Sequence, residues 1–334
     1  MDGGRLLAAR PAAVTEPLEA EYVLPLAWDE DSGLEELRAY LGRLASWIDV
    51  TVVDGSPPDR FAAHRRTLPE AVRHLPPQPW PGPNGKVAGV MTGVRAARHD
   101  RVVLADDDVR YDRAALETVV EALDSAELVR PQNVFDPQPW HARWDTARSL
   151  LNRAFGSDYP GTLGVRRSAL LGAGGYDGHA LFENLELIRT LRAAGGRETR
   201  LDGLAVQRLP PTLDRFLGQR VRQAYDDLAQ PVRLAAELAL LPAALVAARR
   251  PRRLLAAAAL AIVVAEVGRR RNGGRRLFPP TAALWAPAWL TERAVCVWLA
   301  LLALARGGVR YRDRRVRLAA HSQRALASRR NAHA

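Results

Sequence analysis

The stretch Arg101-Val-Val-Leu-Ala-Asp-Asp-Asp-Val-Arg110 joins a short apolar run to three consecutive carboxylates, Asp106, Asp107 and Asp108. An apolar run of this length, rich in valine and leucine, predicts a buried strand. The acids then emerge at its carboxyl end, where open α/β sheets bind their ligands. Carboxylates at positions i and i+2 are able to share one Mg²⁺ or Mn²⁺ ion, which would neutralise a diphosphate. The alternative is a solvated acidic turn that caps the helix expected from Ala114 onward.

Similar patterns precede this stretch. Residues 21–26 and 49–54 read as strands, and residues 34–48 between them carry leucines at helical spacing. A glycine turn at residues 85–86 then leads into another helical pattern. Strands that alternate with helices predict a parallel sheet with crossover connections. The ligand crevice of such a sheet would collect Asp54, Lys86 and the three acids.

Lys86 is the only lysine among the 48 basic residues, so arginine is the ordinary cation of this chain. An ammonium group is a flexible point charge, whereas a guanidinium group is a rigid fork. A turn that faces phosphates often suits the former, and we predict that Lys86 contacts phosphate. The alternative is a surface lysine without a role.

Five motifs resemble, in order and spacing, those of family 2 glycosyltransferases with the GT-A fold. They occupy residues 22–30, 52–56, 85–93 and 105–108, and the fifth combines residues 174–177 with 181–187. The resemblance implies a Rossmann-like α/β domain that uses a nucleotide-diphosphate sugar. It implies that Asp54 contacts the base, that Pro25 and Glu30 lie beside the nucleotide, and that Lys86 lies by the phosphates. It also implies that Asp106 and Asp108 hold Mg²⁺ or Mn²⁺ on the diphosphate.

The sequence departs from the family pattern at the general base. Inverting transfer of a sugar needs a group that removes the acceptor hydroxyl proton. The family usually supplies it as the Asp of a Glu-Asp pair, but this chain has Glu183-Asn184. A neutral amide cannot accept that proton. Therefore Glu183 or a nearby acid such as Asp158 or Glu186 takes over, or the acceptor is already an anion. We predict a catalytic site at Glu183 and Asn184 with Glu183 as base; the alternative is an ordinary helix start.

Residues 129–145 are unusually rich in tryptophan and in side chains that form hydrogen bonds. A pyranose presents CH patches and hydroxyls, which suit ring faces and polar neighbours. We predict that Trp140 and His141, together with Arg143 and Trp144, contact the donor or acceptor, and that Gly161 forms the floor of the acceptor site. Tryptophan is equally suited to packing at a domain edge or to contact with a bilayer.

Residues 219–223 resemble the Gln-x-x-Arg-Trp element of membrane-bound family members, with Gln223 where tryptophan is expected. Gln219 and Arg222 lie three residues apart on one helical face, and we predict that they touch the diphosphate or the acceptor. The missing aromatic argues against processive polymer synthesis.

Three apolar segments follow, at residues 234–248, 254–265 and 294–305, the last preceded by an apolar stretch at residues 285–290. Each uninterrupted apolar run is shorter than the about 20 residues that span a bilayer. From residue 249 onward the chain has 19 arginines against three acidic residues, and every connection is basic. A hairpin that spans poorly, or re-entrant and interfacial helices, therefore fits better than three alternating spans. We expect contact with anionic membrane lipids, and no nucleic-acid partner, because interleaved aromatics are missing. The alternative is a soluble helical domain with a basic rim.

These patterns divide the chain into an N-terminal extension (1–20), a GT-A domain (21–228), membrane-associated helices (229–309) and a basic tail (310–334). Residues 1–20 lack the apolar core of a secretory signal, and the lone Cys296 fits a reducing compartment. We therefore expect the catalytic domain at the cytoplasmic face of the cell membrane. The predicted function is metal-dependent, inverting sugar transfer to a lipid-linked or cell-envelope saccharide acceptor. A non-catalytic nucleotide-sugar-binding or scaffold protein of this fold is the alternative, suggested by Asn184 and Gln223.

Overall fold

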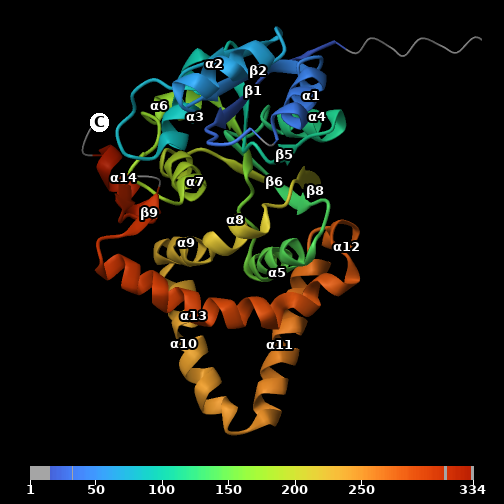
Figure 1. Ribbon diagram of the computed structural model, residues 1–334, viewed down its shortest axis with the longest axis vertical. Helices are drawn as coiled ribbons and strands as arrows, with labels where there is room; N and C mark the ends of the chain where they lie inside the picture. The colour runs from blue at the N-terminus through green and yellow to red at the C-terminus, as the bar shows by residue number, and fades with distance from the viewer. Residues whose placement is uncertain (1–15, 32, 312–313, 332–334) are drawn as a thin grey trace, which may run out of the picture.

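The computed structural model describes residues 16–31, 33–311 and 314–331 (Figure 1). The catalytic part contains one large sheet. Its strands are β1 (Leu18–Leu26), β2 (Ile48–Asp54), β3 (Val72–Leu75), β4 (Arg101–Ala105), β5 (Val109–Arg110), β6 (Leu128–Phe135), β7 (Thr162–Arg166) and β8 (Glu198–Arg208). They are ordered β3-β2-β1-β4-β7-β6-β8-β5.

The parallel sheet predicted from the sequence is confirmed for β1 to β4, which pair in parallel. Beyond β4 the sheet is mixed, because β7 runs antiparallel to both β4 and β6. The carboxyl ends of β1, β2 and β4 therefore meet at one edge. This edge places the residues that follow these strands close together in space.

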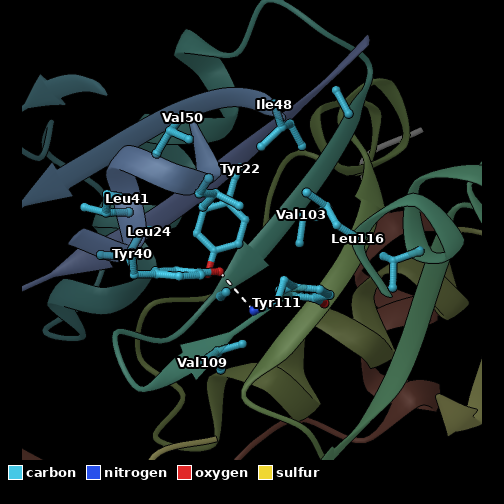
Figure 2. Packing of buried hydrophobic residues seen from close by; sticks show 14 of the residues in the cluster. Tyr22, Leu24, Tyr40, Leu41, Ile48, Val50, Val103, Val109, Tyr111 and Leu116 are labelled. Atoms are coloured by element: carbon cyan, nitrogen blue, oxygen red, sulfur yellow. Dashed lines mark hydrogen bonds between the residues drawn. The ribbon is translucent and has the colours of Figure 1, made fainter. Parts of the chain in front are cut away.

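Alternation along β1 directs side chains into two cores, one on each face of the sheet. Tyr22 and Leu24 pack on one face with α1 (Leu34–Leu44) and α4 (Arg113–Ala122). Val23 packs on the other face with α3 (Gly85–Ala96), α6 (Arg167–Gly172) and α7 (Glu183–Ala193). Figure 2 shows the first core, where Tyr22 makes edge contacts with Tyr40 and Tyr111 at centroid distances of 6.5 and 6.2 Å. The Tyr111 backbone N–H donates to the Tyr40 hydroxyl at 3.0 Å, which ties β5 to α1.

The three acids after β4 do not cap the next helix. Asp112 does so, since its Oδ1 accepts from the Ala115 N–H at 2.7 Å at the start of α4. The alternative of a capping turn at Asp106 to Asp108 is therefore wrong, and these acids are left for another role.

A helical layer follows the sheet domain. It comprises α8 (Leu213–Gly218), α9 (Arg220–Tyr225), the 3-10 turn η1 (Asp226–Ala229), α10 (Pro231–Ala248), α11 (Pro251–Arg270), α12 (Gly274–Leu277), η2 (Pro280–Trp285) and α13 (Ala286–Ala305). Helices α10 and α11 form a V-shaped hairpin that projects from the body, and α13 runs across its open end (Figure 1). Helix α13 packs against α9 and α5 (Trp140–Phe155), which join the layer to the catalytic part.

The hairpin arms carry large apolar side chains on their surface. Leu255 is 70% exposed and Leu260 is 63% exposed, both on α11, and Leu245 and Val246 of α10 are also exposed. Two segments, Pro231–Ala248 and Pro280–Ala305, are long and apolar enough to cross a membrane, judged by length and composition alone. The apolar stretches predicted from the sequence are helices. Of α10, α11 and α13, α11 is the least apolar, because arginines occupy both of its ends.

After α13 the chain returns to the catalytic part. Residues that we predicted as a basic tail form a hairpin of β9 (Val309–Tyr311) and β10 (Arg314–Val316), followed by α14 (Gln323–Asn331), which packs on α7. The His321 N–H donates to Glu186 at 2.7 Å, and Leu181 N–H donates to the Leu318 carbonyl at 2.9 Å. Positions 312–313 and 332–334 of the predicted tail, and 1–15 of the predicted extension, lie outside the described residues.

Candidate active site

A cavity of about 1000 Å³ opens at the carboxyl edge of the sheet. Its wall on the β1 and β2 side includes Pro25, Glu30, Val53, Gly55 and Lys86. The three acids after β4 form its centre. The opposite wall comes from β8, α5, the region from α8 to η1, and β9, and includes Asp145, Arg148, Arg208, Arg215, Gln219, Arg222, Gln223, Asp226, Arg310 and Tyr311.

Lys86 lies between two carboxylates. It follows Asn84, whose side chain caps α3 by accepting from the Lys86 N–H at 3.1 Å. The Lys86 ammonium forms ion pairs with Asp106 and Glu183. Burial alone would lower the pKa of Lys86, but the charges of Asp106 and Glu183 outweigh it and hold that pKa well above its ordinary value. Lys86 is therefore a permanent cation beside the acidic centre.

Arg208 at the end of β8 contacts both outer acids. Its Nε donates to Asp108 Oδ2 at 2.9 Å, and a terminal nitrogen lies 3.4 Å from Asp106 Oδ2. Gly161 lies against this pair, since a Cβ there would stand 2.7 Å from Asp106 Oδ2 and 3.2 Å from Arg208. A larger residue would therefore displace the Asp106 carboxylate or the Arg208 guanidinium. Gly161 was predicted as the floor of the acceptor site, but it does not line the cavity.

The acidic centre fits a hard divalent cation. Asp108 Oδ1 is buried and has no hydrogen-bond partner among the described residues, so one oxygen of a cavity-lining carboxylate is left unused. Burial raises the pKa of Asp108, against the opposing effect of Arg208, and the negative charges of Asp106 and Asp107 raise it further. Carboxylate oxygens are the ligands preferred by Mg²⁺ and Mn²⁺. Asp107 differs from its neighbours because it accepts a hydrogen bond from the Trp28 indole.

Asp54 lies behind the cavity wall rather than in it. Its buried carboxylate accepts from the Ser56 N–H at 2.9 Å and contacts His64 Nδ1 at 2.7 Å and His74 Nε2 at 3.0 Å. Burial alone would raise the pKa of Asp54, but hydrogen bonds from His74, Ser56 and His64 outweigh it and hold the pKa well below its usual range. The neighbours Val53 and Gly55 reach the cavity instead.

The predicted aromatic sugar contacts lie outside the cavity lining. Trp140 packs edge-on against His141, Trp144 and Phe216. His141 Nε2 lies 2.9 Å from the Pro211 carbonyl, while the Trp144 indole donates to Glu292 of α13 at 2.8 Å. This cluster joins α5 to α8 and to α13, which is the packing role that tryptophan also suits.

The candidate bases also differ in position. Glu183 is buried against Lys86, and Asn184 Nδ2 donates to the Pro160 carbonyl at 3.2 Å. Asp158 accepts from Asn152 at 2.8 Å, and Glu186 is bound by His321. None of these four side chains lines the cavity, whereas Gln219 and Arg222 do.

Sequence reasoning missed several residues of the cavity. Arg208 and Arg148 lie outside every motif, and Arg310 and Tyr311 come from the segment predicted as a basic tail. The Tyr311 hydroxyl donates to Asn84 at 3.1 Å, and the Arg222 guanidinium lies 4.9 Å from the Tyr311 ring centre. The sequence carried a signal for Arg310 alone, the excess of arginine from residue 249 onward, which we attributed to lipid contact.

Comparisons with known proteins agree with this architecture. The model of the family described as glycosyltransferase-like family 2 matches residues 50–226, more than half of the chain. The mannosyltransferase PcManGT from Pyrobaculum calidifontis, solved with GDP-Man and Mn²⁺, is similar over 85% of this chain and 88% of its own, with a TM-score of 0.52 and 18% identity. S. aureus TarS 1–349, solved with UDP-GlcNAc, is similar over 60% of this chain and 61% of its own, with a TM-score of 0.41 and 14% identity. No curated protein matches significantly. The predicted GT-A fold is thus confirmed, and the chain belongs to glycosyltransferase-like family 2 and is a glycosyltransferase.

Proposed function

We propose that this glycosyltransferase is metal-dependent and inverting. In this proposal it moves a sugar from a nucleotide-diphosphate donor to a lipid-linked or cell-envelope saccharide at the cytoplasmic membrane face. The observation that carries the proposal is the arrangement of Asp106 and Asp108 between Lys86 and Arg208 in one cavity. The similar mannosyltransferase, which binds GDP-Man with Mn²⁺, supports the donor class and the cofactor.

Different residues around the acidic centre would contact different parts of the donor. Pro25 and Glu30 line the wall where a nucleotide would lie, and Asp54 holds that wall in place through His64 and His74. Mg²⁺ or Mn²⁺ held by Asp106 and Asp108 would offset the charge of the departing diphosphate. Lys86 adds a fixed positive charge beside the same group, because its pairing keeps it protonated.

Four arginines on the opposite wall support an acceptor or donor that carries phosphate. Arg148, Arg215, Arg222 and Arg310 line the cavity, and the described residues give none of them a carboxylate within ion-pair distance. The buried Arg148 Nε has no hydrogen-bond partner among those residues either. In contrast, Arg110, Arg208 and Arg220 are paired with acids. Unpaired guanidinium groups are suited to phosphate oxygens, as a lipid-linked diphosphate would present.

Donor binding is the first test of this function. A panel of nucleotide sugars that includes GDP-mannose should contain a member that raises the melting temperature of the full-length protein in Mn²⁺ but not in chelator. A ligand present at 100 times its Kd adds about 2.7 kcal/mol to stability. Binding without transfer of labelled sugar into a membrane lipid extract would instead favour a non-catalytic nucleotide-sugar-binding role.

The α10 and α11 hairpin is the proposed membrane anchor. Its arms expose leucine and valine, and arginines 249, 250, 252 and 253 lie at its tip, where anionic headgroups would meet them. The full-length protein should float with vesicles that contain anionic lipid. Leu255→Glu combined with Leu260→Glu should leave it at the bottom of the gradient with donor binding intact, since both side chains are exposed and far from the cavity lining. A wild-type protein that stays monomeric and soluble without detergent or lipid would contradict this anchor.

A further inference from the structure

We propose that Asp226, rather than Glu183, is the general base that removes the proton from the acceptor hydroxyl. This inference rests on the proposed function, because it assumes that a hydroxyl group attacks a nucleotide-diphosphate sugar in the cavity. It answers the question raised by Asn184, which stands where the family usually has its base.

Most carboxylates of the cavity are already engaged. Asp106 and Asp108 contact Arg208, and Asp107 accepts from Trp28. Asp145 receives two hydrogen bonds from Arg220 at 2.7 and 3.1 Å, and Glu36 is paired with Arg110.

Three cavity carboxylates have no hydrogen bond or ion pair to any described residue, namely Asp29, Glu30 and Asp226. Asp29 and Glu30 follow β1 on the wall where the nucleotide would lie. Asp226 is the free carboxylate on the opposite wall.

The position of Asp226 aligns it with the predicted acceptor contacts. Gln219, Arg222, Gln223 and Asp226 recur at intervals of three and four residues through α9 and into η1, and all four line the cavity. Side chains at this spacing share one helical face. Asp226 therefore lies one turn beyond Arg222 on the face that the acceptor would meet, whereas Glu183 lies behind Lys86.

The surroundings of Asp226 suit a base at neutral pH. Burial raises the pKa of Asp226 to about 7; the positive charges of Arg222, Arg148 and Arg293 oppose this rise, and the negative charge of Asp227 adds to it. Asp227 is itself held by Arg233 and Arg293, each at 3.0 Å, so it is not available to the cavity. A base works best when its pKa lies near the working pH. Burial also raises the pKa of Glu183, but that carboxyl is committed to Lys86.

The proposed step conserves atoms and charge. The Asp226 carboxylate takes the proton of an acceptor hydroxyl as that oxygen forms a bond to the anomeric carbon of the donor. The bond from the anomeric carbon to the diphosphate oxygen breaks, and its electron pair leaves with the nucleoside diphosphate. Protonated Asp226 then releases the proton to solvent. The attack on the face opposite the leaving group gives inversion.

The test compares Asp226→Asn with Asp226→Glu in the full-length protein, using labelled nucleotide sugar and total membrane lipid extract. Asp226→Asn should lower kcat by about 10² to 10⁴ without changing metal-dependent donor binding. The wild-type rate should fall tenfold per pH unit below pH 7, because protonated Asp226 cannot accept a proton. Asp226→Glu should restore part of the rate and should keep the fall in rate below pH 7. Substitution of a residue with a purely structural role would not give this pH dependence.

Asp214→Asn serves as the matched control, because Asp214 is an exposed acid of α8 that does not line the cavity. It should leave rate and pH profile unchanged. If Asp226→Asn kept the full rate and the same fall in rate below pH 7, the assignment of Asp226 would be overturned, but the proposed function would not. This result is expected if the acceptor is a phosphate that needs no base. If the fall in rate below pH 7 disappeared in Glu183→Gln but not in Asp226→Asn, Glu183 would be the general base. Absence of metal-dependent donor binding in the wild type would overturn the proposed function and this assignment with it.

Discussion

Asp108→Asn is expected to abolish sugar transfer, with a loss of about 10³-fold or more, and to weaken metal-dependent donor binding. The substitution replaces the charged side chain that we propose as a metal ligand by a neutral amide of the same size. It also removes the partner of Arg208, whose Nε donates to Asp108 at 2.9 Å. The buried Oδ1 that has no partner among the described residues is the atom that a divalent cation would use, so its loss acts on the metal more than on the fold.

The measurement is a Mn²⁺ titration of transfer and of nucleotide binding by calorimetry. Asp107→Asn is the matched control within the same acidic run, because Asp107 accepts from Trp28 and contacts neither Arg208 nor Lys86. It should retain donor binding. Equal rates of wild type and Asp108→Asn in chelator and in Mg²⁺ would rule out the metal site.

Lys86→Met is expected to cost about 3 kcal/mol of stability and to eliminate transfer. The substitution keeps an unbranched chain but removes the cation that pairs with Asp106 and Glu183. Glu183 then has no ion-pair partner among the described residues, and Asp106 keeps only Arg208. Unfolding in urea would measure the stability change, and a labelled-sugar assay would measure transfer.

A double substitution separates the two effects of Lys86. In Lys86→Met combined with Glu183→Gln, the uncompensated negative charge of Glu183 is gone, so part of the lost stability should return. Transfer should not return, because the ammonium group beside Asp106 is still missing. If Lys86→Met alone were as stable as the wild type, the ion pairs with Asp106 and Glu183 would not contribute to stability as the geometry indicates.

Local signals in the sequence were sufficient for the first half of the fold. The strands ending near Leu26, Asp54 and Ala105 were recognisable because apolar runs stop at acids and turns. Their parallel pairing then placed Lys86 and the acids in one cavity, as expected. The mixed second half was not foreseen, because the direction of β7 depends on its pairing with both β4 and β6.

Residues that reach the site through tertiary contacts could not be identified in the same way. Arg208 approaches Asp108 only because β8 pairs beside β6, far from β4 in sequence. His64 and His74 lie outside the five motifs, yet both converge on Asp54. The composition that suggested sugar contacts at Trp140 instead reflects a junction between α5, α8 and the helical layer.

The return of the chain after α13 has a consequence for how the enzyme is made. The chain leaves the catalytic part at Gln230 and rejoins it at Val309, so both ends of the segment from α10 to α13 lie on one side of any bilayer that the α10 and α11 hairpin enters. An even number of crossings, or none, satisfies that requirement. Arg310 and Tyr311 are also synthesised after α10 to α13, and they complete the cavity wall. A nascent chain is therefore expected to complete its cavity wall only after α10 to α13 have been synthesised.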